Sequence, residues 1–220
     1  RMAREAVPGM KILLLGKDGQ VGWELQRSLA VVGEVVALDR HGEQGLVGDL
    51  NDTTGLAATV RAVRPSVIVN AAAYTAVDKA ESEPALARAI NTEAPDVLAT
   101  EAKSLGALLV HYSTDYVFDG SGHSPWTEDS VPAPLSIYGA TKLGGEEAIR
   151  ASGCLHLILR TSWVYGARGN NFPRTMLRLA MERDELGVVA DQFGAPTGAD
   201  LLADATAHAV RTFLGNTNLS

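Results

Sequence analysis

The sequence has a single cysteine, no long apolar run and no excess of basic residues. Cys154 alone cannot form an internal disulfide, and a lone thiol fits a reducing compartment, so we expect a cytoplasmic location. No apolar stretch approaches the roughly 20 residues that span a bilayer, so no membrane-spanning helix is expected. The net charge of −7 argues against nucleic acid as a partner. No histidine or carboxylate cluster has the spacing of metal ligands, so the sequence predicts no metal site.

What the chain does contain is an alternation of apolar runs and helical patterns from residue 11 to residue 214. With 220 residues, 46% of them hydrophobic and 20% charged, it can bury a full core. The alternation predicts an α/β fold with a Rossmann-like, doubly wound parallel sheet and helices on both faces. The expected strands cover residues 11–15, 34–38, 49–50, 67–69, 108–112 and 154–160.

A glycine motif follows the first expected strand. Gly16, Gly19 and Gly22 come directly after the apolar run 11–15 and open a segment with helical spacing. In such a turn the first glycine permits the tight bend, the second lets a pyrophosphate approach the backbone, and the third lets helix pack on strand. Three glycines at this spacing arise in so glycine-rich a chain with a chance of about 0.2, so the pattern alone is weak evidence, and the strand before it and the helix after it strengthen it.

Two later strand ends extend this dinucleotide site. Asp39 closes the second strand, where a carboxylate would hold the adenosine ribose of NAD, although a simple turn aspartate is the alternative. Arg40 follows and could instead meet the 2′-phosphate of NADP, which leaves the choice of cofactor open. The small residues 71–73 after the fourth expected strand would let a flat cofactor lie against the backbone, unless they serve only close helix packing.

A tyrosine and a lysine mark the candidate chemistry. Tyr138 and Lys142 lie four residues apart, so their side chains leave one helix face. A nearby ammonium is expected to lower the phenol pKa from about 10, which suits proton transfer to or from a substrate oxygen. Only roughly 0.1 such pairs are expected here by chance, but a surface helix with an extended lysine is the simpler alternative. Thr114, at a strand's carboxyl end, could bind the same oxygen, whereas His111 is expected to be a core histidine.

Further expectations concern the connections. Residues 74–82 read as a polar loop, and Pro95 as the start of a second helical segment. In the last third of the chain, Phe172, Met176 and Leu179 are expected to form the inner face of one helix. A last amphipathic helix is expected after Asp200, and it carries Leu201, Ala205, Ala209 and Phe213.

Four longer strings narrow the assignment. Residues 70–81 read NAAAYTAVDKAE, residues 111–120 HYSTDYVFDG, residues 160–165 RTSWVY and residues 191–197 DQFGAPT. From residue 10 to about 213 the chain closely resembles the dTDP-4-dehydrorhamnose reductase family of the extended short-chain dehydrogenase/reductase superfamily. The resemblance implies NADPH- or NADH-dependent reduction of the 4-keto group of dTDP-4-dehydro-6-deoxy-L-mannose to dTDP-L-rhamnose, a precursor of cell-surface polysaccharide.

The resemblance also implies site residues at matching positions. The catalytic group would be Thr114, Tyr138 and Lys142. The cofactor would meet Gly16, Gly19, Gln20, Val21, Gly22, Asp39, Asp49, Leu50, Ala72, Ala73, Tyr74, Thr75, Tyr138 and Lys142. The dTDP-sugar would meet Thr114, Asp115, Tyr138, Trp163, Asn171 and the loop 192–197.

Rival functions share much of this pattern. A nucleotide-sugar 4,6-dehydratase needs an Asp-Glu pair after the threonine, but Thr114 is followed by Asp115 and Tyr116. That difference favours simple reduction. Another nucleotide-sugar reductase or epimerase is a further alternative. From a different class, a non-catalytic regulatory subunit, like the reductase-like partner of methionine adenosyltransferase, would not require Thr114, Tyr138 and Lys142 together.

The family pattern also suggests how the chain is divided. Residues 1–9 have no apolar core of a signal peptide and read as an extension, residues 10–166 as the dinucleotide-binding domain, and residues 167–220 as the start of a nucleotide-sugar-binding region. Family members continue beyond this length, and their Mg²⁺ site and homodimer contacts lie partly there. We therefore expect this 220-residue form to bind cofactor and to turn substrate over slowly.

Overall fold

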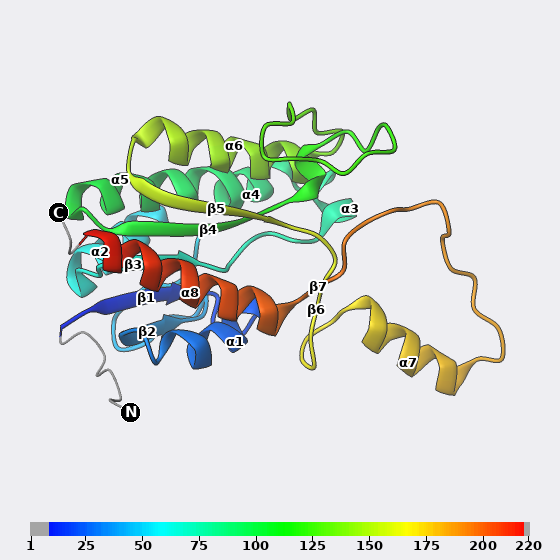
Figure 1. Cartoon of the computed structure of the whole chain (residues 1–220), viewed down its shortest axis with the longest axis horizontal. Helices are drawn as coiled ribbons and strands as arrows, with labels where there is room; N and C mark the ends of the chain where they lie inside the picture. The colour runs from blue at the N-terminus through cyan, green and yellow to red at the C-terminus, as the bar shows by residue number, and fades with distance from the viewer. Residues whose placement is uncertain (1–8, 218–220) are drawn as a thin grey trace.

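A five-stranded parallel sheet forms the centre of the molecule (Figure 1). The computed structural model describes residues 9–217. The strands run in the order β2-β1-β3-β4-β5, and each pairs in parallel with its neighbours. The predicted doubly wound α/β fold is confirmed. The strands are β1 (Lys11–Leu15), β2 (Glu34–Leu38), β3 (Val67–Asn70), β4 (Leu108–Thr114) and β5 (Leu155–Thr161).

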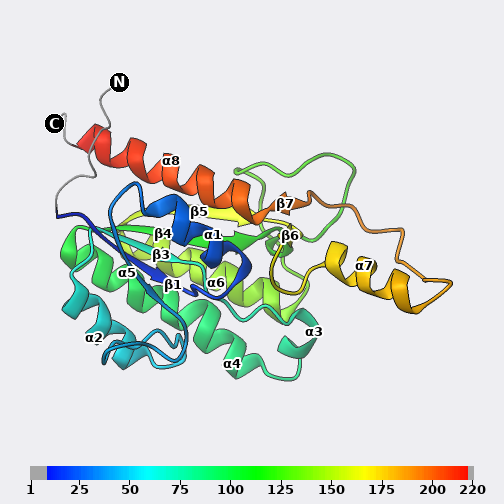
Figure 2. The ribbon, with the colours of Figure 1, turned by 90° about the horizontal axis from the view of Figure 1, so that it is seen from below.

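Helices cover both faces of the sheet (Figure 2). Helices α1 (Gln20–Leu29) and α8 (Ala199–Thr217) cover one face, and α2 (Thr53–Val63), α5 (Ala94–Leu105) and α6 (Ile137–Ser152) cover the other. Since strand side chains alternate, Ile12 and Leu14 of β1 pack toward α1 and α8, whereas Leu13 and Leu15 pack toward α2 and α5. Burial on both faces explains the uninterrupted apolar runs in the sequence.

The strand order sets the position of the ligand crevice. From β1 the chain moves to β2 on one side and then crosses to β3 on the other, so the order reverses between β1 and β3. In open parallel sheets, ligands bind outside the carboxyl ends of the strands at this switch point. Gly16 follows β1 there and Ala71 follows β3, and the Ala71 amide donates to the Leu15 carbonyl at 3.0 Å.

The predicted strand at residues 49–50 is wrong. The segment after β2 folds into a turn in which Gly42, Gln44 and Gly45 have positive φ angles, and only an isolated bridge joins Glu43 to Leu46. This backbone cannot extend along the edge of β2, so β2 is the edge strand. Leu50 is buried beside α2 instead.

Two predicted connections also differ. The expected loop 74–82 contains a short helix, α3 (Val77–Ala80). Residues 84–105 form one continuous helical stretch, made of α4 (Pro84–Arg88), the π-helical η1 (Ala89–Glu93) and α5. Pro95 has no N–H for the Asn91 carbonyl, and the Ala94 amide bonds the Ala89 carbonyl five residues back. Pro95 thus lies just after a π-helical turn, and the helix is not broken there.

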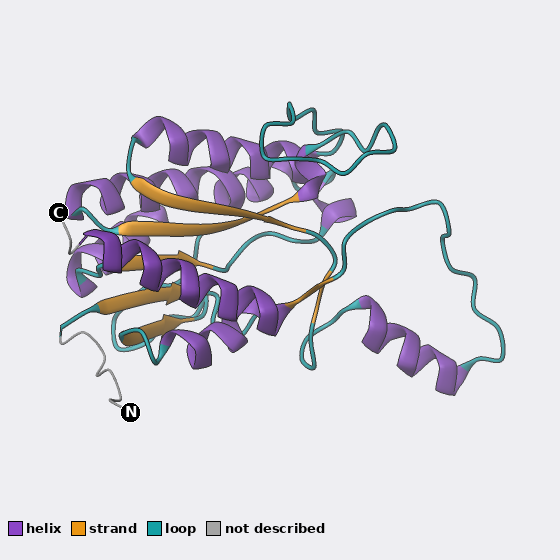
Figure 3. Ribbon diagram, viewed as in Figure 1, coloured by secondary structure: helices purple, strands orange, loops and turns teal. Residues whose placement is uncertain are grey.

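The predicted inner face at Phe172, Met176 and Leu179 is wrong. In the last helix Leu201 and Ala205 are exposed, whereas Phe213 packs partly buried against the core. Helix α7 (Phe172–Glu182) buries no residue, and Phe172 and Met181 are largely exposed. Figure 1 shows α7 projecting away from the sheet, so its apolar face has no layer to cover it. Figure 3 shows the long connection from α7 to β7 (Thr197–Gly198), which pairs with β6 (Val164–Tyr165). Helix α8 turns small residues inward, because it packs closely on α1: Ala199, Ala203, Thr206, Ala207 and Val210.

Candidate active site

The glycine turn between β1 and α1 is tightly packed against its own backbone. Gly16 has a φ of +85°, and its amide donates to the Leu38 carbonyl at 2.8 Å. A Cβ on Gly22 would lie 2.0 Å from the Gly16 carbonyl oxygen, so helix and turn touch only because residue 22 is glycine. Gly19 stands before the first helical residue and is exposed. The α1 N-terminus, with no acidic residue in its first turn, fits a pyrophosphate.

A polar clamp ties this turn to the segment before α7. The Gln20 side chain donates to the Val164 carbonyl at 3.3 Å and accepts a hydrogen bond from Asn171 Nδ2 at 2.8 Å. Arg168 lies 3.7 Å above the Trp23 ring centroid. Asn171 also caps α7 by accepting from the Arg174 amide. No sequence pattern predicts the clamp, since its halves are about 150 residues apart.

Asp39 stands at the end of β2 as predicted. Its carboxylate accepts from the His41 amide at 2.8 Å and lies 3.9 Å from Lys17 Nζ. The His41 hydrogen bond is the main reason why its pKa is lowered. An ionised carboxylate at this position can accept hydrogen bonds from ribose hydroxyls.

Asn91 holds the segment after β3 and was missed by the sequence reading. Its buried side chain accepts from the Tyr74 amide at 2.9 Å and donates to the Tyr74 carbonyl at 3.1 Å. Its amide also donates to Thr141 Oγ1 of α6 at 3.3 Å. Tyr74 of this segment is thereby tied to η1, and Asn91 is tied in turn to α6. No pattern at Asn91 suggests this role, because it depends on the π turn.

Tyr138 and Thr114 meet at the carboxyl end of the sheet. Burial raises the pKa of Tyr138, and the Thr114 hydroxyl, as a hydrogen-bond partner, acts in the opposite direction. The charge of Asp115 raises it further. Asp115 in turn accepts from Thr114 Oγ1 at 3.1 Å and from Ser162 Oγ at 2.6 Å. The site therefore keeps the proton on Tyr138 at neutral pH.

Lys142 does not lower the Tyr138 pKa, so that expectation is wrong. Its side chain is 2% exposed, and Nζ donates to the Tyr112 carbonyl at 2.6 Å and lies 3.2 Å from His111 Nε2. Burial lowers the Lys142 pKa to about 8, against the charge of Glu146, which raises it. The side chains of Tyr138 and Lys142 leave one face of α6, but that of Lys142 bonds to the Tyr112 carbonyl of β4.

A buried carboxylate fixes α6 to β5. Glu146, fully buried one turn after Lys142, accepts two hydrogen bonds from Arg160 at 2.9 and 2.7 Å and one from Arg150 at 2.8 Å. The Arg160 guanidinium also lies 4.9 Å from the Phe118 ring centroid. This network orients the helix that carries Tyr138.

The remaining predicted residues lie at the rim. Trp163, with a φ of +45°, is 45% exposed, and a Cβ on Gly194 would lie 2.8 Å from its indole, so the loop 191–198 passes close to the ring. Thr75 is exposed, and Ala72 and Ala73 are partly exposed. Asp49 caps a turn by accepting from the Asn51 amide, away from the Tyr138 region.

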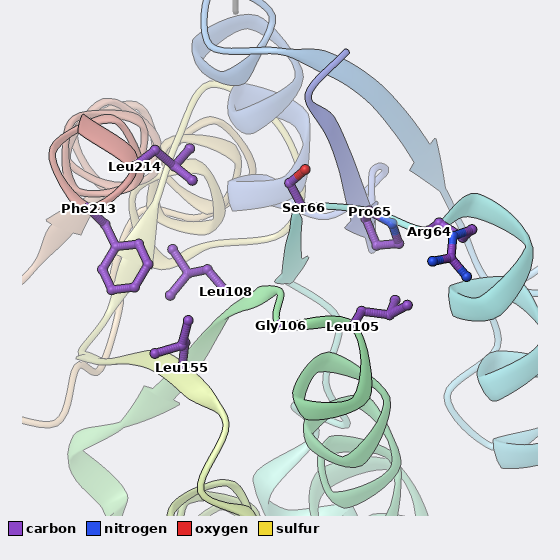
Figure 4. Close-up of a pocket in the computed structure, with 9 residues that line it drawn as sticks. All are labelled: Arg64, Pro65, Ser66, Leu105, Gly106, Leu108, Leu155, Phe213 and Leu214. Atoms are coloured by element: carbon purple, nitrogen blue, oxygen red, sulfur yellow. The ribbon is translucent and has the colours of Figure 1, made fainter. Parts of the chain in front are cut away.

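Other features of the described residues lie outside this site. A cavity of about 300 Å³ is lined by Ser66, Leu108 and Leu155 among others. Figure 4 shows these residues around it. These residues precede or begin β3, β4 and β5, so the cavity is at the opposite edge of the sheet. Within residues 9–217 we find no group of three or more His, Cys, Asp or Glu side chains arranged for a metal ion. No helix in the same range is long and apolar enough to cross a membrane.

The comparison with known proteins agrees with this geometry. Residues 10–219 match the family model described as RmlD substrate binding domain. Over 211 residues the chain is 57% identical to dTDP-4-dehydrorhamnose reductase of Escherichia coli, covering 96% of this chain and 70% of that protein. The chain belongs to the dTDP-4-dehydrorhamnose reductase family.

Further members of this reductase family support the assignment. The Salmonella typhimurium reductase is 60% identical over 205 residues, with 93% of this chain and 68% of the relative covered. The Clostridium acetobutylicum reductase structure has a TM-score of 0.85 at 42% identity and covers 91% of this chain and 70% of its own. The Bacillus anthracis reductase, determined in complex with NADP, has a TM-score of 0.83 at 38% identity, with coverages of 90% and 70%.

Two glycine substitutions test whether the turn of this reductase-family chain holds a dinucleotide. Gly22→Ala is expected to lower the free energy of unfolding by about 1–3 kcal/mol, because its Cβ meets fixed backbone. Gly19→Ala would meet only the Gly16 oxygen, at 3.3 Å, so it should fold almost normally and yet bind NADPH at least about tenfold more weakly, a loss of about 1.4 kcal/mol. Thermal unfolding and fluorescence titration measure the two effects. Undiminished NADPH affinity in Gly19→Ala would exclude the turn as the pyrophosphate site.

Proposed function

We propose that the chain reduces the 4-keto group of dTDP-4-dehydro-6-deoxy-L-mannose, giving dTDP-L-rhamnose, with NADPH or NADH as the reductant. The observation that carries this proposal is the 57% identity to a named reductase over nearly the whole chain. The juxtaposition of Thr114 and Tyr138 at the carboxyl end of the sheet supports it. We also propose the division into residues 1–9, 10–166 and 167–220.

The cofactor fits the residues at the switch point. The Gly16–Gly22 turn would hold the pyrophosphate, Asp39 the adenosine ribose, and residues 72–75 would border the rest. The Bacillus anthracis relative in complex with NADP supports a nicotinamide dinucleotide here. When bound, the nicotinamide supplies the hydride for the keto carbon. Lys17 and Arg40 beside Asp39 supply positive charge for a 2′-phosphate, so we expect NADPH to be accepted.

Tyr138 supplies the proton. As negative charge develops on the keto oxygen, a phenol that still holds its proton can donate it, and burial at this position favours the protonated form. The Thr114 hydroxyl has one proton, which it donates to Asp115 in this structure, so it adds a second hydrogen bond to the same oxygen by turning that proton from Asp115 to the substrate. Asp115 and Ser162 orient the threonine hydroxyl, since Asp115 accepts from both.

Lys142 holds the nicotinamide ribose. Besides Cε, its nitrogen has three tetrahedral directions, of which one points to the Tyr112 carbonyl and one to His111. In this proposal a ribose hydroxyl takes the third direction. Lys142 therefore positions the cofactor. The pKa of Tyr138 is set by burial more than by this lysine.

The sugar-nucleotide is expected at the rim of the crevice. Trp163 would pack on the sugar, and Asn171 and residues 192–197 would meet the nucleotide. The clamp between Gln20 and Asn171 places this side next to the glycine turn. A homodimer, a cytoplasmic location and the absence of nucleic-acid binding are parts of the same proposal.

A steady-state assay with the dTDP-4-keto sugar tests the function. NADPH and NADH are compared, with dTDP-L-rhamnose identified as the product. We expect oxidation of the cofactor only when the keto sugar is present. Cofactor binding without any sugar reduction, together with capture of a synthetase partner, would instead support the regulatory-subunit alternative.

A further inference from the structure

A buried row of polar groups runs beneath the proposed site. Asn70 of β3, His111 of β4 and Lys142 of α6 are each at least 98% buried. Asn70 Nδ2 lies 3.2 Å from His111 Nδ1, and His111 Nε2 lies 3.2 Å from Lys142 Nζ. At its other end, Asn70 Oδ1 accepts from the Ala72 amide at 3.2 Å. The row thus joins the loop after β3 to the lysine.

The donors and acceptors along this row restrict where its protons lie. Because Asn70 Oδ1 is engaged by the Ala72 amide, the NH₂ end faces His111 Nδ1, which must accept. A neutral imidazole has one N–H, so its proton lies on Nε2 and points at Lys142. A neutral amine can accept that proton as a hydrogen bond, whereas an ammonium has no lone pair.

Charging Lys142 therefore requires a change at His111. An ammonium needs Nε2 as an acceptor, which moves the ring proton to Nδ1, and Nδ1–H then faces the Asn70 amide NH₂. The clash between these two donors is relieved when the Asn70 side-chain amide turns over. This turn breaks the hydrogen bond that Asn70 Oδ1 accepts from the Ala72 backbone amide. Protonation of Lys142, the His111 tautomer and the loop at Ala72 are thus linked by geometry.

We propose that His111 is a positioning residue for Lys142: it holds Nζ beside the Tyr112 carbonyl and couples the proton on Lys142 to the Asn70 amide and the Ala72 loop. The groups facing Lys142 are His111 and the Tyr112 carbonyl from β4 and Glu146 from its own helix, whose charge favours the ammonium. Burial of His111 and the charge of Lys142 both lower the His111 pKa, which keeps the ring neutral. The contribution of Lys142 to catalysis rests on the proposed function, but this coupling does not.

Nitrogen NMR of the histidine rings tests the coupling without any turnover. The chain is labelled with ¹⁵N-histidine and titrated across the Lys142 pKa of about 8. We expect the His111 ring to carry its proton on Nε2 above this pH and to shift to Nδ1 below it. In Lys142→Met the transition should disappear. His156, whose Nδ1 bonds the Cys154 carbonyl, is the internal reference for a ring outside this row. A tautomer that stays constant, or that changes equally in Lys142→Met, would overturn the proposal.

Activity measurements then separate positioning from mere support of the core. His111→Gln keeps an amide near the place of Nε2, whereas His111→Leu removes both donor and acceptor. The alkaline limb of the kcat/KM profile is where Lys142 loses its proton. We expect this limb to stay near wild type in the glutamine variant. In the leucine variant it should move by about one pH unit, which is a tenfold change in the proton affinity of Lys142. His156→Leu, on the neighbouring strand, should leave the limb in place. Equal limbs in both His111 variants, with both folded, would contradict the positioning role. Loss of all activity in wild type, with the NMR transition intact, would count against the proposed function alone.

Discussion

Tyr138→Phe is expected to lower turnover by about 10²–10⁴-fold while NADPH affinity stays close to wild type. Phenylalanine keeps the ring and removes only the hydroxyl proton that we assign to the keto oxygen. Because burial raises the Tyr138 pKa, the wild-type phenol retains that proton at neutral pH, and a reduction consumes it. Stopped-flow measurement of cofactor oxidation, with a separate NADPH titration, gives the two quantities.

Tyr116→Phe provides the matched control. The Tyr116 ring meets the Tyr138 ring edge-on, with centroids 5.5 Å apart, and is 41% exposed. Tyr116→Phe removes a phenol hydroxyl from the neighbouring ring but no catalytic proton. Turnover of this variant should therefore remain near wild type. If Tyr138→Phe behaved like Tyr116→Phe, Tyr138 would not be the proton donor.

Arg160→Leu is expected to lower the free energy of unfolding at neutral pH by about 3 kcal/mol. The substitution removes both hydrogen bonds from Arg160 to the fully buried Glu146 carboxylate and leaves the one from Arg150 in place. Burial alone would raise the Glu146 pKa, and Arg160 is the largest of the influences that lower it. Urea unfolding of the variant and wild type measures the loss. Arg150→Leu is the control: Arg150 is half exposed, so its removal should cost less than about 1 kcal/mol.

The pH dependence of this loss follows from the sign of the shift. In wild type the Glu146 pKa is lowered, so its ion pairs stabilise the fold above the unfolded value of about 4.5 and the benefit fades as pH falls below it. In Arg160→Leu burial dominates and the pKa rises, so protonation relieves the cost at low pH. The gap between the two proteins should narrow toward pH 4. A gap independent of pH would show that Arg160 acts by packing, through its contact with Phe118, and not by charge.

The sheet could be predicted from the sequence, but the edges of the fold could not. Runs such as residues 12–15 are apolar because both faces are buried, and that pattern is local. The false strand at 49–50 arose because an apolar residue, Leu50, marks burial without marking strand pairing. The face of α7 was misread because amphipathic spacing shows which side could be buried and not whether another layer exists.

For the site, spacing predicted the elements but not the hydrogen-bond partners. The four-residue spacing of Tyr138 and Lys142 gave the shared helix face correctly. It could not show that Lys142 Nζ reaches the Tyr112 carbonyl on β4, since that depends on how α6 packs on the sheet. His111 was expected to be an ordinary core histidine, and its contacts with Asn70 and Lys142 appear only once three elements are assembled. Asn91 and Glu146 were missed for the same reason.

Deuterium transfer in a single turnover tests the proposed reaction most directly. The chain is mixed in molar excess with the dTDP-4-keto sugar and NADPH carrying deuterium at the transferable C4 position, so that even slow chemistry is observed. NMR of the product should show dTDP-L-rhamnose with deuterium at sugar C4, formed much more slowly by Tyr138→Phe. Recovery of unreduced keto sugar after prolonged incubation, or deuterium anywhere other than C4, would contradict the assignment of this chain as the reductase.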